Sequence, residues 1–586
     1  MHVARIRSSH TDKSGRLREY ESAYLRRTYR DAGKVRHETL ANLSGLGEQT
    51  VASIEAALKG TPLVPVSQAM TVTRSLPHGH VAAVHAMAAR LGLPALLGPP
   101  CRERDLALAL VISRVAAPAS KLATLTWWAD TTLGADLGVA AASTDDVYAA
   151  MDWLEDRQDE IEGQLARRHL APAVNPSRMA LFDLSSSWME GRRCPLAARG
   201  YSRDGKKGTL QIEYGLLTDP EGRPVAIRVF EGNTGDPAAF TAIVKVVREK
   251  FGLAKMVMVG DRGMITAARI DALNKLEDGT QHGNPYGWIT ALRAPAIKKL
   301  MDGDGPLQLS LFDQQDLAEI SHPDYPGERL VACRNPVLAA ERARKREDLL
   351  AATEKLLAPL VTRVQAGRLA GAAKIGVEAG KVIGQHKMGK HFDVTITDDS
   401  LTITRKQHQI DAEAALDGLY VIRTPLRPGE LDGPGVVTAY KNLKNVERDF
   451  RHIKADDLDL RPVLHRLEER VRAHVLICML AAYLTWHLRR AWAPLTFTDE
   501  NPPVHANPVG PARRSAHAQA KASYQHDETG RPYRSFRGLL SHLATLTRNQ
   551  VRFAGTSADI PVLAEPTSIQ RQAFELIEKP VPLALA

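Results

Sequence analysis

The stretch "YKNLKNVERDFRHIK", residues 440–454, carries polar side chains at a spacing that a helix would bring onto one face. Tyr440, Glu447 and Lys454 follow one another at intervals of seven residues. An α-helix has about 3.6 residues per turn, so each such interval falls roughly 20° short of two full turns. The spacing therefore predicts a single helix with an aromatic hydroxyl, a carboxylate and an ammonium in one row.

Two aspartates stand at the ends of apolar segments elsewhere in the chain. Asp183 ends "ALFD" (180–183), and Asp261 ends "KMVMVGD" (255–261). A carboxylate at the end of a buried strand is unfavourable unless it is paired, hydrogen-bonded or bound to a metal. If the two strands are neighbours, about 4.8 Å apart, both carboxylates converge on one place, and Glu447 could supply a third.

Three carboxylates form a set of hard oxygen ligands that suits Mg²⁺, with Mn²⁺ as an alternative. Two such ions about 3.5–4 Å apart activate the attacking oxygen and neutralise the leaving oxygen in a phosphodiester displacement. We therefore expect Asp183, Asp261 and Glu447 to be catalytic residues and ligands of two Mg²⁺ ions. Taken singly, each has an ordinary interpretation, the aspartates as turn or capping residues and the glutamate as a solvated helix charge.

The composition is that of a soluble globular protein with a basic excess. The chain has 586 residues, of which 44% are hydrophobic and 25% charged, and a net charge of +10. That charge is compatible with a polyanionic partner. The four scattered cysteines indicate reduced thiols in the cytoplasm. The longest apolar stretch, residues 474–488, is shorter than the roughly 18–20 residues of a membrane span, so we interpret it as a buried helix and expect no membrane association.

The pattern of apolar runs and turn residues divides the chain into six predicted parts. Hairpin-linked strands followed by alternating strands and helices indicate an α/β fold, with a mixed sheet and flanking helices. The parts are an N-terminal β-hairpin region (1–75), a helical region (76–175), a region of strands and helices (176–294), a stretch that interrupts it (295–415), a second region that resumes the sheet (416–495) and a C-terminal tail region (496–586).

The spacing at residues 440–454 resembles the YREK signature of bacterial insertion-sequence transposases of the DDE class. That signature is Tyr, two residues, Arg, three residues, Glu, six residues, Lys, and Tyr440, Glu447 and Lys454 match it. The Arg position holds Leu443, and the adjacent Lys444 lies only about 40° round from Tyr440 on a helix. Lys444 could replace the missing charge, but not the bidentate fork of an arginine.

The resemblance extends to the segments around the two aspartates. "FDLSSSWMEG" (182–191) is similar to the family's first-Asp segment, and "VGDRGM" (259–264) is similar to its second. Asp261 follows Asp183 by 78 positions, and Glu447 follows Asp261 by 186, a long interval that is similar to the family's insertion domain.

The resemblance implies an RNase H-like catalytic domain with divalent metal on the three acids. Residues 176–294 and 416–495 would form this domain around an insertion domain (295–415), and residues 76–175 would bind the DNA end. Tyr440, Lys444 and Lys454 would contact DNA phosphates at the transposon end. Apart from the resemblance, Arg262 could contact a DNA phosphate or form a salt bridge with its neighbour. Water would cut at the terminal inverted repeats, and the exposed 3′-OH would attack target DNA without a covalent enzyme intermediate. A homodimer in the synaptic complex and a cytoplasmic, nucleoid-associated location are implied as well.

Other functions remain open from the sequence. An RNase H-like nuclease that only hydrolyses DNA or RNA would need the same three acids. A non-catalytic DNA-binding protein derived from a transposase would be expected to have lost some of them. A metal-dependent phosphatase is a weaker third interpretation, because nothing in the sequence indicates a pocket for a small substrate.

Overall fold

The computed structural model describes residues 1–586 apart from 12–16, 62–68, 176, 254–255, 275–285, 304, 501, 504–506, 525, 527–529 and 586. The described chain divides into two compact units. Unit 1 contains Met1–Leu76 and Thr547–Ala564, and unit 2 contains Pro77–Leu546 and Glu565–Ala586. The finer division into six parts stays a prediction.

Unit 1 begins with a three-stranded antiparallel sheet in the order β1-β2-β3, which is followed by helix α1. Asp31 pairs with Lys34, which leaves Ala32 (φ 46°) and Gly33 (φ 80°) as a two-residue turn. Positive φ angles at both positions are those of a tight hairpin turn, and they confirm the hairpin predicted here. The bounds are β1 His2–Thr11, β2 Leu17–Asp31, β3 Lys34–Asn42 and α1 Glu48–Leu58.

A second three-stranded sheet in unit 1 joins distant parts of the chain. Its order is β16-β15-β4, with β15 and β16 antiparallel. The bounds are β4 Met70–Pro77, β15 Thr547–Phe553 and β16 Asp559–Leu563. The C-terminal region therefore supplies two strands to the N-terminal unit.

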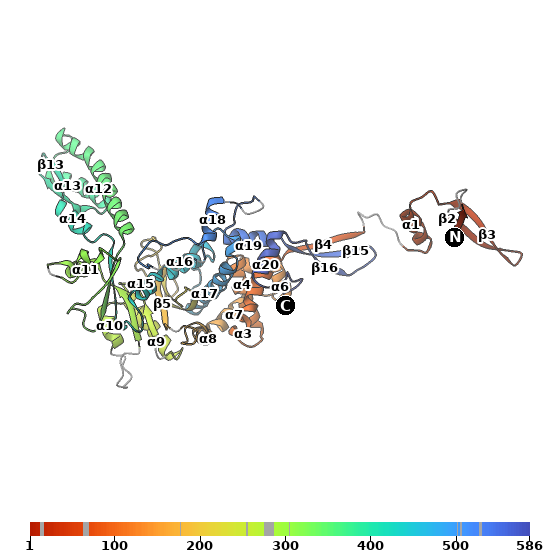
Figure 1. Cartoon of the computed structure of the whole chain (residues 1–586), viewed down its shortest axis with the longest axis horizontal. Helices are drawn as coiled ribbons and strands as arrows, with labels where there is room; N and C mark the ends of the chain where they lie inside the picture. Colours follow the sequence, from red (N-terminus) through yellow and green to blue (C-terminus); the bar gives the residue numbers. More distant parts are fainter. Residues whose placement is uncertain are drawn as a thin grey trace. The chain divides into compact units, whose positions relative to one another are not determined.

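Unit 2 contains an eight-stranded mixed sheet in the order β10-β11-β14-β9-β8-β5-β6-β7. In Figure 1 its strand β5 is labelled between helices α9 (Asp236–Glu249) and α16 (Leu443–Arg451), both of which contact it. Strands β5, β6 and β7 form an antiparallel meander, and β8 and β9 run parallel to β5. The predicted mixed sheet is thus confirmed, although β10 and β11 join it from the stretch predicted as an insertion. The bounds are β5 Met179–Trp188, β6 Gln211–Thr218, β7 Pro224–Glu231, β8 Met256–Val259, β9 Tyr286–Ala291, β10 Leu317–Ile320, β11 Arg329–Arg334 and β14 Leu419–Thr424.

Two helices, α9 (Asp236–Glu249) and α16 (Leu443–Arg451), pack against β5. Phe182 of β5 contacts Phe240 of α9, with ring centroids 6.3 Å apart. Successive side chains of a strand point to opposite faces, so Asp183 points away from α9 and toward the face that α16 covers. The alternation in "ALFD" therefore places the aspartate beside the signature helix.

A helical part of unit 2 surrounds α17 (Glu468–Ala491), which contacts α4, α7 and β7. By length and composition α17 could cross a membrane, but 89% of its apolar window is buried inside the protein. The interpretation of residues 474–488 as a buried helix is thus confirmed. The other helices of this part are α2 Gly79–Arg90, α3 Leu93–Leu97, α4 Arg102–Ala116, α5 Lys121–Ala129, α6 Thr132–Asp136, α7 Thr144–Asp156, α8 Gln158–His169, α18 Ala516–Tyr524, α19 Phe536–Ala544 and α20 Ser568–Leu576.

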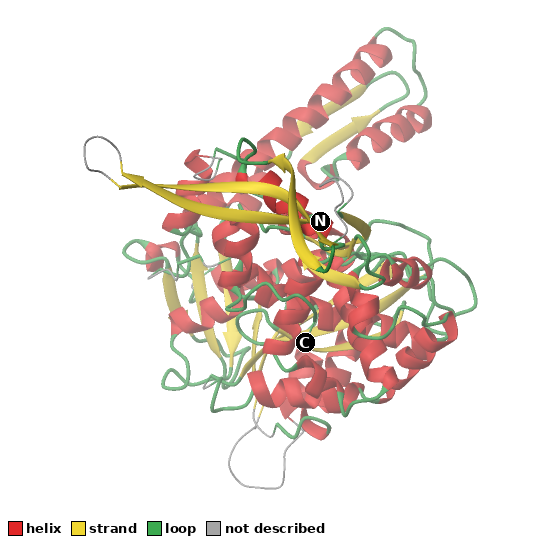
Figure 2. Cartoon of the chain, turned by 90° about the vertical axis from the view of Figure 1, so that its right-hand side faces the viewer, coloured by secondary structure: helices red, strands yellow, loops and turns green. Residues whose placement is uncertain are grey.

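Residues 336–414 form a group of helices around a β-hairpin, seen as helices beside two strands in Figure 2. The long helix α12 packs on α13, and the two helices share an apolar core with the hairpin β12–β13. The bounds are α12 Pro336–Gln365, α13 Ala372–Gln385, β12 Phe392–Ile396, β13 Leu401–Arg405 and α14 Gln407–Ala414, while α10 (Ala267–Asn274) and α11 (Ala294–Met301) precede this group.

Candidate active site

The two predicted aspartates lie at equivalent positions on neighbouring strands. β5 and β8 run parallel, and Leu181 pairs with Val259. Asp183 lies two positions after Leu181, and Asp261 lies two positions after Val259. Both carboxylates therefore lie at the same end of the β5–β8 pairing, so the condition under which the two acids converge is met. Asp183 does not end its strand as its apolar run suggested, because β5 continues to Trp188.

Backbone N–H groups hold one oxygen of each aspartate. Leu184 N donates to Asp183 Oδ1 at 2.8 Å. Gly263 N and Met264 N both donate to Asp261 Oδ1 at 2.9 Å. Within the described residues, no hydrogen bond reaches Oδ2 of either aspartate. One oxygen of each carboxylate is thus oriented by the backbone, and the other is left for a ligand.

The third acid lies close enough to affect the ionisation of Asp183. The pKa of Asp183 is raised to about 7, mainly by burial and additionally by the charges of Asp261 and Glu447. The Leu184 N–H and the charge of Arg203 act in the opposite direction. Like charges disfavour each other's ionisation only over short distances. The sheet and α16 therefore bring the three predicted acids together.

Tyr440 belongs to the same cluster. It lies in the last turn of α15 (Gly433–Lys441). Its pKa is raised to about 12 by burial and by the charges of the three acids, whereas the charge of Arg262 lowers it. Glu447 and Arg262 are exposed, while Asp183 and Tyr440 are half-buried. The arrangement therefore presents carboxylates, a phenol and a guanidinium at one partly open surface.

The signature stretch does not form the single helix predicted from its spacing. α15 ends at Lys441, α16 begins at Leu443, and residues His452–Asp456 form a π-helix. The π-helix has wider turns than an α-helix, with Asp457 N donating to His452 O. The wider turn shifts the position of Lys454 relative to Glu447, so the continuous row expected from the spacing is wrong.

The side chain of Lys454 is buried in the protein and does not lie at the exposed surface beside the three acids. Its Nζ donates to Asp204 Oδ1 at 2.9 Å, and Arg461 Nη1 donates to the same oxygen at 2.7 Å. Trp188 N donates to Asp204 Oδ2 at 3.2 Å. Burial is the main reason that the pKa of Lys454 is lowered. The ammonium of Lys454 is therefore the ion-pair partner of the buried Asp204 carboxylate in this structure.

Leu443, at the usual Arg position, is buried, and Lys444 is exposed. Replacing Leu443 by Arg would restore the signature but would force a guanidinium into an apolar site. We expect Leu443→Arg to lower the free energy of unfolding by about 1–3 kcal/mol without raising DNA affinity. Denaturant unfolding and gel-shift titration measure the two quantities, with Lys444→Arg as the control for added guanidinium at the surface. A stable Leu443→Arg variant with tighter DNA binding would contradict this assignment.

Three charged residues of the site were not predicted from the sequence. Arg203 Nη1 contacts Glu213 Oε1 at 3.2 Å, and Arg203 Nη2 donates to Asp236 Oδ1. A Cβ at Gly263 would lie 3.5 Å from Asp236 Oδ2 and 3.6 Å from Asp261 Oδ2, so these two carboxylates border the same space. In the sequence Arg203 and Asp236 look like ordinary loop and helix-start charges, and no local pattern marks them.

The chemistry of the donors fits a divalent cation, although the side chains do not form a closed metal cluster. Among the described residues, no three His, Cys, Asp or Glu side chains are close enough together to hold a metal ion. The three acids do offer hard oxygen atoms and mutual repulsion that a cation would relieve. The donor chemistry is therefore of the kind that Mg²⁺ prefers, but the described side chains are not arranged as a metal site in this structure.

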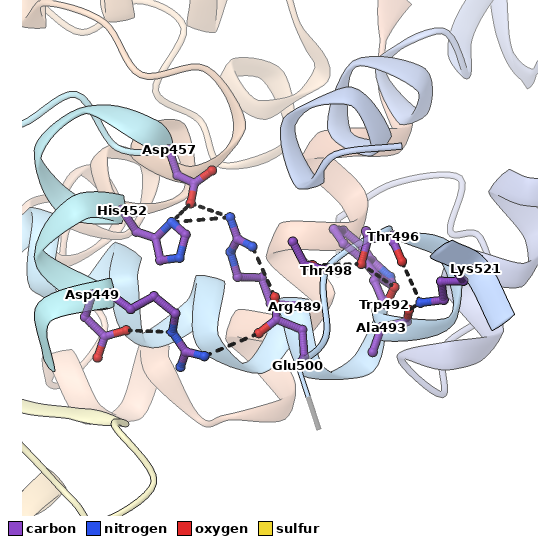
Figure 3. Close-up of polar contacts among 11 residues, drawn as sticks. Asp449, His452, Asp457, Arg489, Trp492, Ala493, Thr496, Thr498, Glu500 and Lys521 are labelled. Carbon is purple, nitrogen blue, oxygen red and sulfur yellow. Dashed lines mark hydrogen bonds and ion pairs between the residues drawn. The ribbon is translucent and has the colours of Figure 1, made fainter. Parts of the chain in front are cut away.

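A network of ion pairs beside a cavity of about 670 Å³ joins the π-helix and the residue after it to α17. Arg489 Nη2 lies 2.6 Å from Asp457 Oδ2, and Arg489 Nη1 lies 3.2 Å from Glu500 Oε1. His452 Nδ1 lies 2.7 Å from the same Asp457 oxygen (Figure 3). These contacts hold the segment that directly follows α16, the helix that carries Glu447.

Comparison with known proteins gives one family match. Residues 6–63 match the N-terminal domain of IS1634 family transposases. This match supports an insertion-sequence transposase. The matched segment contains the hairpin β2–β3 and all of α1, which lie in unit 1.

The remaining comparisons add little. No curated protein sequence matches the chain. The structure is similar to that of a piggyBac transposase in a synaptic complex with hairpin DNA, with 9% sequence identity and a TM-score of 0.32 over 79% of this chain and 76% of that chain. A similarity at that TM-score does not establish a fold.

Proposed function

We propose that the chain is a DDE transposase that cuts at the ends of an insertion sequence and joins the 3′-OH to target DNA. The observation that carries the proposal is the convergence of Asp183, Asp261 and Glu447 from two neighbouring strands and one helix. The match of residues 6–63 to a transposase domain supports the same function independently of these acids. A phosphatase or an unrelated nuclease would not be expected to carry that domain.

The arrangement of the sheet supports an RNase H-like catalytic domain. The first aspartate lies on β5, the first strand of an antiparallel meander, and the second follows a strand parallel to it. The glutamate comes from a helix much later in the chain that packs on β5. This order of elements and acids is the one that the resemblance to YREK-group transposases implies.

In the proposed reaction, the three acids would move together around the metal, while the backbone groups that orient the two aspartates keep their observed positions. Asp183, Asp261 and Glu447 would hold two Mg²⁺ ions, or Mn²⁺, which when bound activate the attacking oxygen and neutralise the leaving one. Backbone N–H groups fix Oδ1 of both aspartates and thereby direct Oδ2 toward the DNA side. The phenol of Tyr440 stays protonated at neutral pH, because its pKa is about 12, so it can donate a hydrogen bond to a phosphate oxygen.

The DNA-binding surface would include the exposed cations beside the acids. Lys444 and Arg262 are exposed, and the charge of Arg262 reaches Tyr440. We assign both to backbone phosphates of the transposon end, with Tyr440 between them. Terminal inverted repeats and target DNA would be the nucleic-acid partners, and a homodimer would hold two ends together in the cytoplasm of a bacterium.

The proposal predicts nicking at a defined position. Purified protein with Mg²⁺ should nick a labelled duplex that carries the DNA flanking the gene at the boundary of the repeat. Glu447→Gln should lose nicking by roughly 10³-fold or more while still binding the duplex, because it removes one metal ligand from an exposed helix position. Glu341→Gln, on the exposed face of α12, is the matched control. Equal nicking by the Glu447→Gln and Glu341→Gln variants would overturn the assignment of the third acid.

A further inference from the structure

The segment from Gly200 to Gly208, between β5 and β6, has an unusual surface for a loop beside a cluster of acids. We refer to it as the 200–208 loop. Tyr201 is 79% exposed, and Lys206 and Lys207 are exposed as well. An aromatic ring and two ammonium groups thus face solvent within a span of seven residues. Aromatic rings combined with cations are the usual means by which proteins hold single-stranded nucleic acid.

Buried ionic contacts hold the loop firmly. Asp204, whose side chain is 2% exposed, accepts hydrogen bonds from Lys454, Arg461 and the backbone of Trp188. These three donors come from the π-helix, the segment after it and the end of β5. The carboxylate therefore ties the middle of an otherwise exposed loop to the sheet and to the signature stretch.

The neighbouring residue forms a second anchor. Arg203 N donates to Ser186 Oγ at 3.0 Å, and its guanidinium pairs with Glu213 of β6 and Asp236 of α9. Arg203 is thus held by two acidic side chains, and the next residue, Asp204, is held by two basic ones. The loop is anchored at its centre on both sides, so its exposed residues are presented on a rigid base.

The loop lies next to the acids. Arg203 Nη2 donates to Asp236 Oδ1, and Asp236 Oδ2 borders the same space beside Gly263 as Asp261 Oδ2. The guanidinium carbon of Arg203 lies 5.8 Å from the centre of the Tyr201 ring.

Lys206 Nζ lies 3.4 Å from the centre of the Trp188 ring, which belongs to the same strand as Asp183. Trp188 follows Asp183 by five positions, so its ring lies on the other face of β5 and roughly 16 Å further along the strand. The exposed Tyr201 ring is therefore the part of the loop beside the carboxylates, and Lys206 lies further along the path that a DNA strand would take from them.

We propose that the 200–208 loop holds an unpaired stretch of the DNA end beside the acid cluster, and that Lys454 is a positioning residue that acts through Asp204. Tyr201 stacks on a base of this stretch, and Lys206 and Lys207 contact its phosphates. The last residue of the signature then serves DNA binding without touching DNA, because its ammonium is occupied by the carboxylate that anchors the loop. This inference rests on the proposed function, since it assumes that a DNA end is the substrate.

The first test uses the ring of Tyr201, which can be changed without touching the anchors. The probe is a single-stranded oligonucleotide of the transposon end that carries a fluorescent adenine analogue, whose emission is quenched by stacking. We expect Tyr201→Ala to weaken binding about tenfold and to abolish the quenching, and Tyr201→Phe to preserve both. Tyr201→Ala with wild-type affinity and quenching would overturn the proposal. Quenching without nicking in the wild-type protein would instead support the loop and count against the transposase function.

The second test separates positioning from direct contact. If Lys454 positions the loop, Lys454→Met and Asp204→Asn should both weaken binding and make the loop more sensitive to trypsin at Lys206 and Lys207. Both should change the dependence of affinity on salt to the same extent, because the only phosphate contacts weakened in either variant are those of Lys206 and Lys207 on the loosened loop. If Lys454→Met lowers the salt slope by about one contact while Asp204→Asn has no effect, Lys454 touches DNA directly and the proposal is wrong. Thermal unfolding of both variants shows whether either substitution unfolds the protein as a whole. If it does, the Tyr201 variants, which leave both anchors intact, test the role of the loop in DNA binding.

Discussion

Replacing Asp183 by Asn should lower the rate of DNA cleavage by roughly 10³-fold or more while making the protein more stable above neutral pH. The loss of rate is expected because the amide cannot serve as an anionic metal ligand. The gain in stability is expected because the carboxylate is buried near Asp261 and Glu447, which raise its pKa. Asn keeps the shape of the side chain and removes this repulsion.

The sign of the pH dependence follows from the direction of the shift. The pKa of Asp183 rises from 3.8 to about 7 on folding, so the folded protein holds this proton more tightly than the unfolded chain. The stability that the protonated form provides is complete below about pH 4 and is lost as the pH rises through about 7. The loss amounts to a free energy on the order of 4 kcal/mol before any metal binds.

Thermal unfolding in the absence of metal at pH 5 and pH 8 measures this difference. The wild-type protein should lose more stability between the two pH values than Asp183→Asn does. Asp130→Asn, an exposed aspartate at the end of α5, is the control and should follow the wild-type protein in both stability and cleavage. An Asp183→Asn variant that cleaves DNA at the wild-type rate would remove Asp183 from the active site.

Replacing Arg203 by Met should destabilise the protein by about 3–5 kcal/mol. The guanidinium is the ion-pair partner of Glu213, whose side chain is 2% exposed, and it also pairs with Asp236. Burial already raises the pKa of Glu213 to about 7 despite the attraction of Arg203. Without the guanidinium, a buried carboxylate is left to be protonated or hydrated at the cost of folding free energy.

A double variant separates the stability effect from the functional one. In Arg203→Met/Glu213→Gln the buried charge is removed together with its partner, so most of the lost stability should return. Cleavage should stay at least about tenfold below the wild-type rate, because the cation beside Asp183 is still missing. Denaturant unfolding and the nicking assay measure the two effects. A single Arg203→Met variant as stable as the wild-type protein would show that the ion pair with Glu213 contributes nothing to folding.

The strands that carry the acids could be predicted from the sequence because their signal is local. "ALFD" and "KMVMVGD" are short apolar runs that end in a carboxylate; the first lies inside β5, and Met256–Val259 of the second form β8. The alternation of side chains along β5 also determines which face Asp183 lies on. The hairpin of β2 and β3 was predictable for the same reason, since its turn residues lie between two strand-like segments.

The features that the sequence did not reveal depend on distant partners. Lys454 and Asp204 are separated by 250 residues, and a helical spacing argument cannot show that one will neutralise the other. The change from α-helix to π-helix at His452 likewise depends on how the chain continues into the packed segment at Leu458 and Leu460. Strand β15 pairs with β4, which lies more than 450 residues earlier in the chain, and β16 pairs with β15. No local pattern in the sequence predicts a sheet between segments so far apart.

The joining of a pre-cut transposon end to target DNA tests the central claim most directly. The substrate is a labelled duplex that already ends in the 3′-OH of the terminal repeat, mixed with plasmid DNA, Mg²⁺ and either the wild-type protein or Glu447→Gln. The proposed function predicts labelled plasmid with the wild-type protein and none with the variant, because joining needs the same three acids as cutting. Cleavage of the duplex at scattered positions without any labelled plasmid would contradict a transposase and indicate a nuclease.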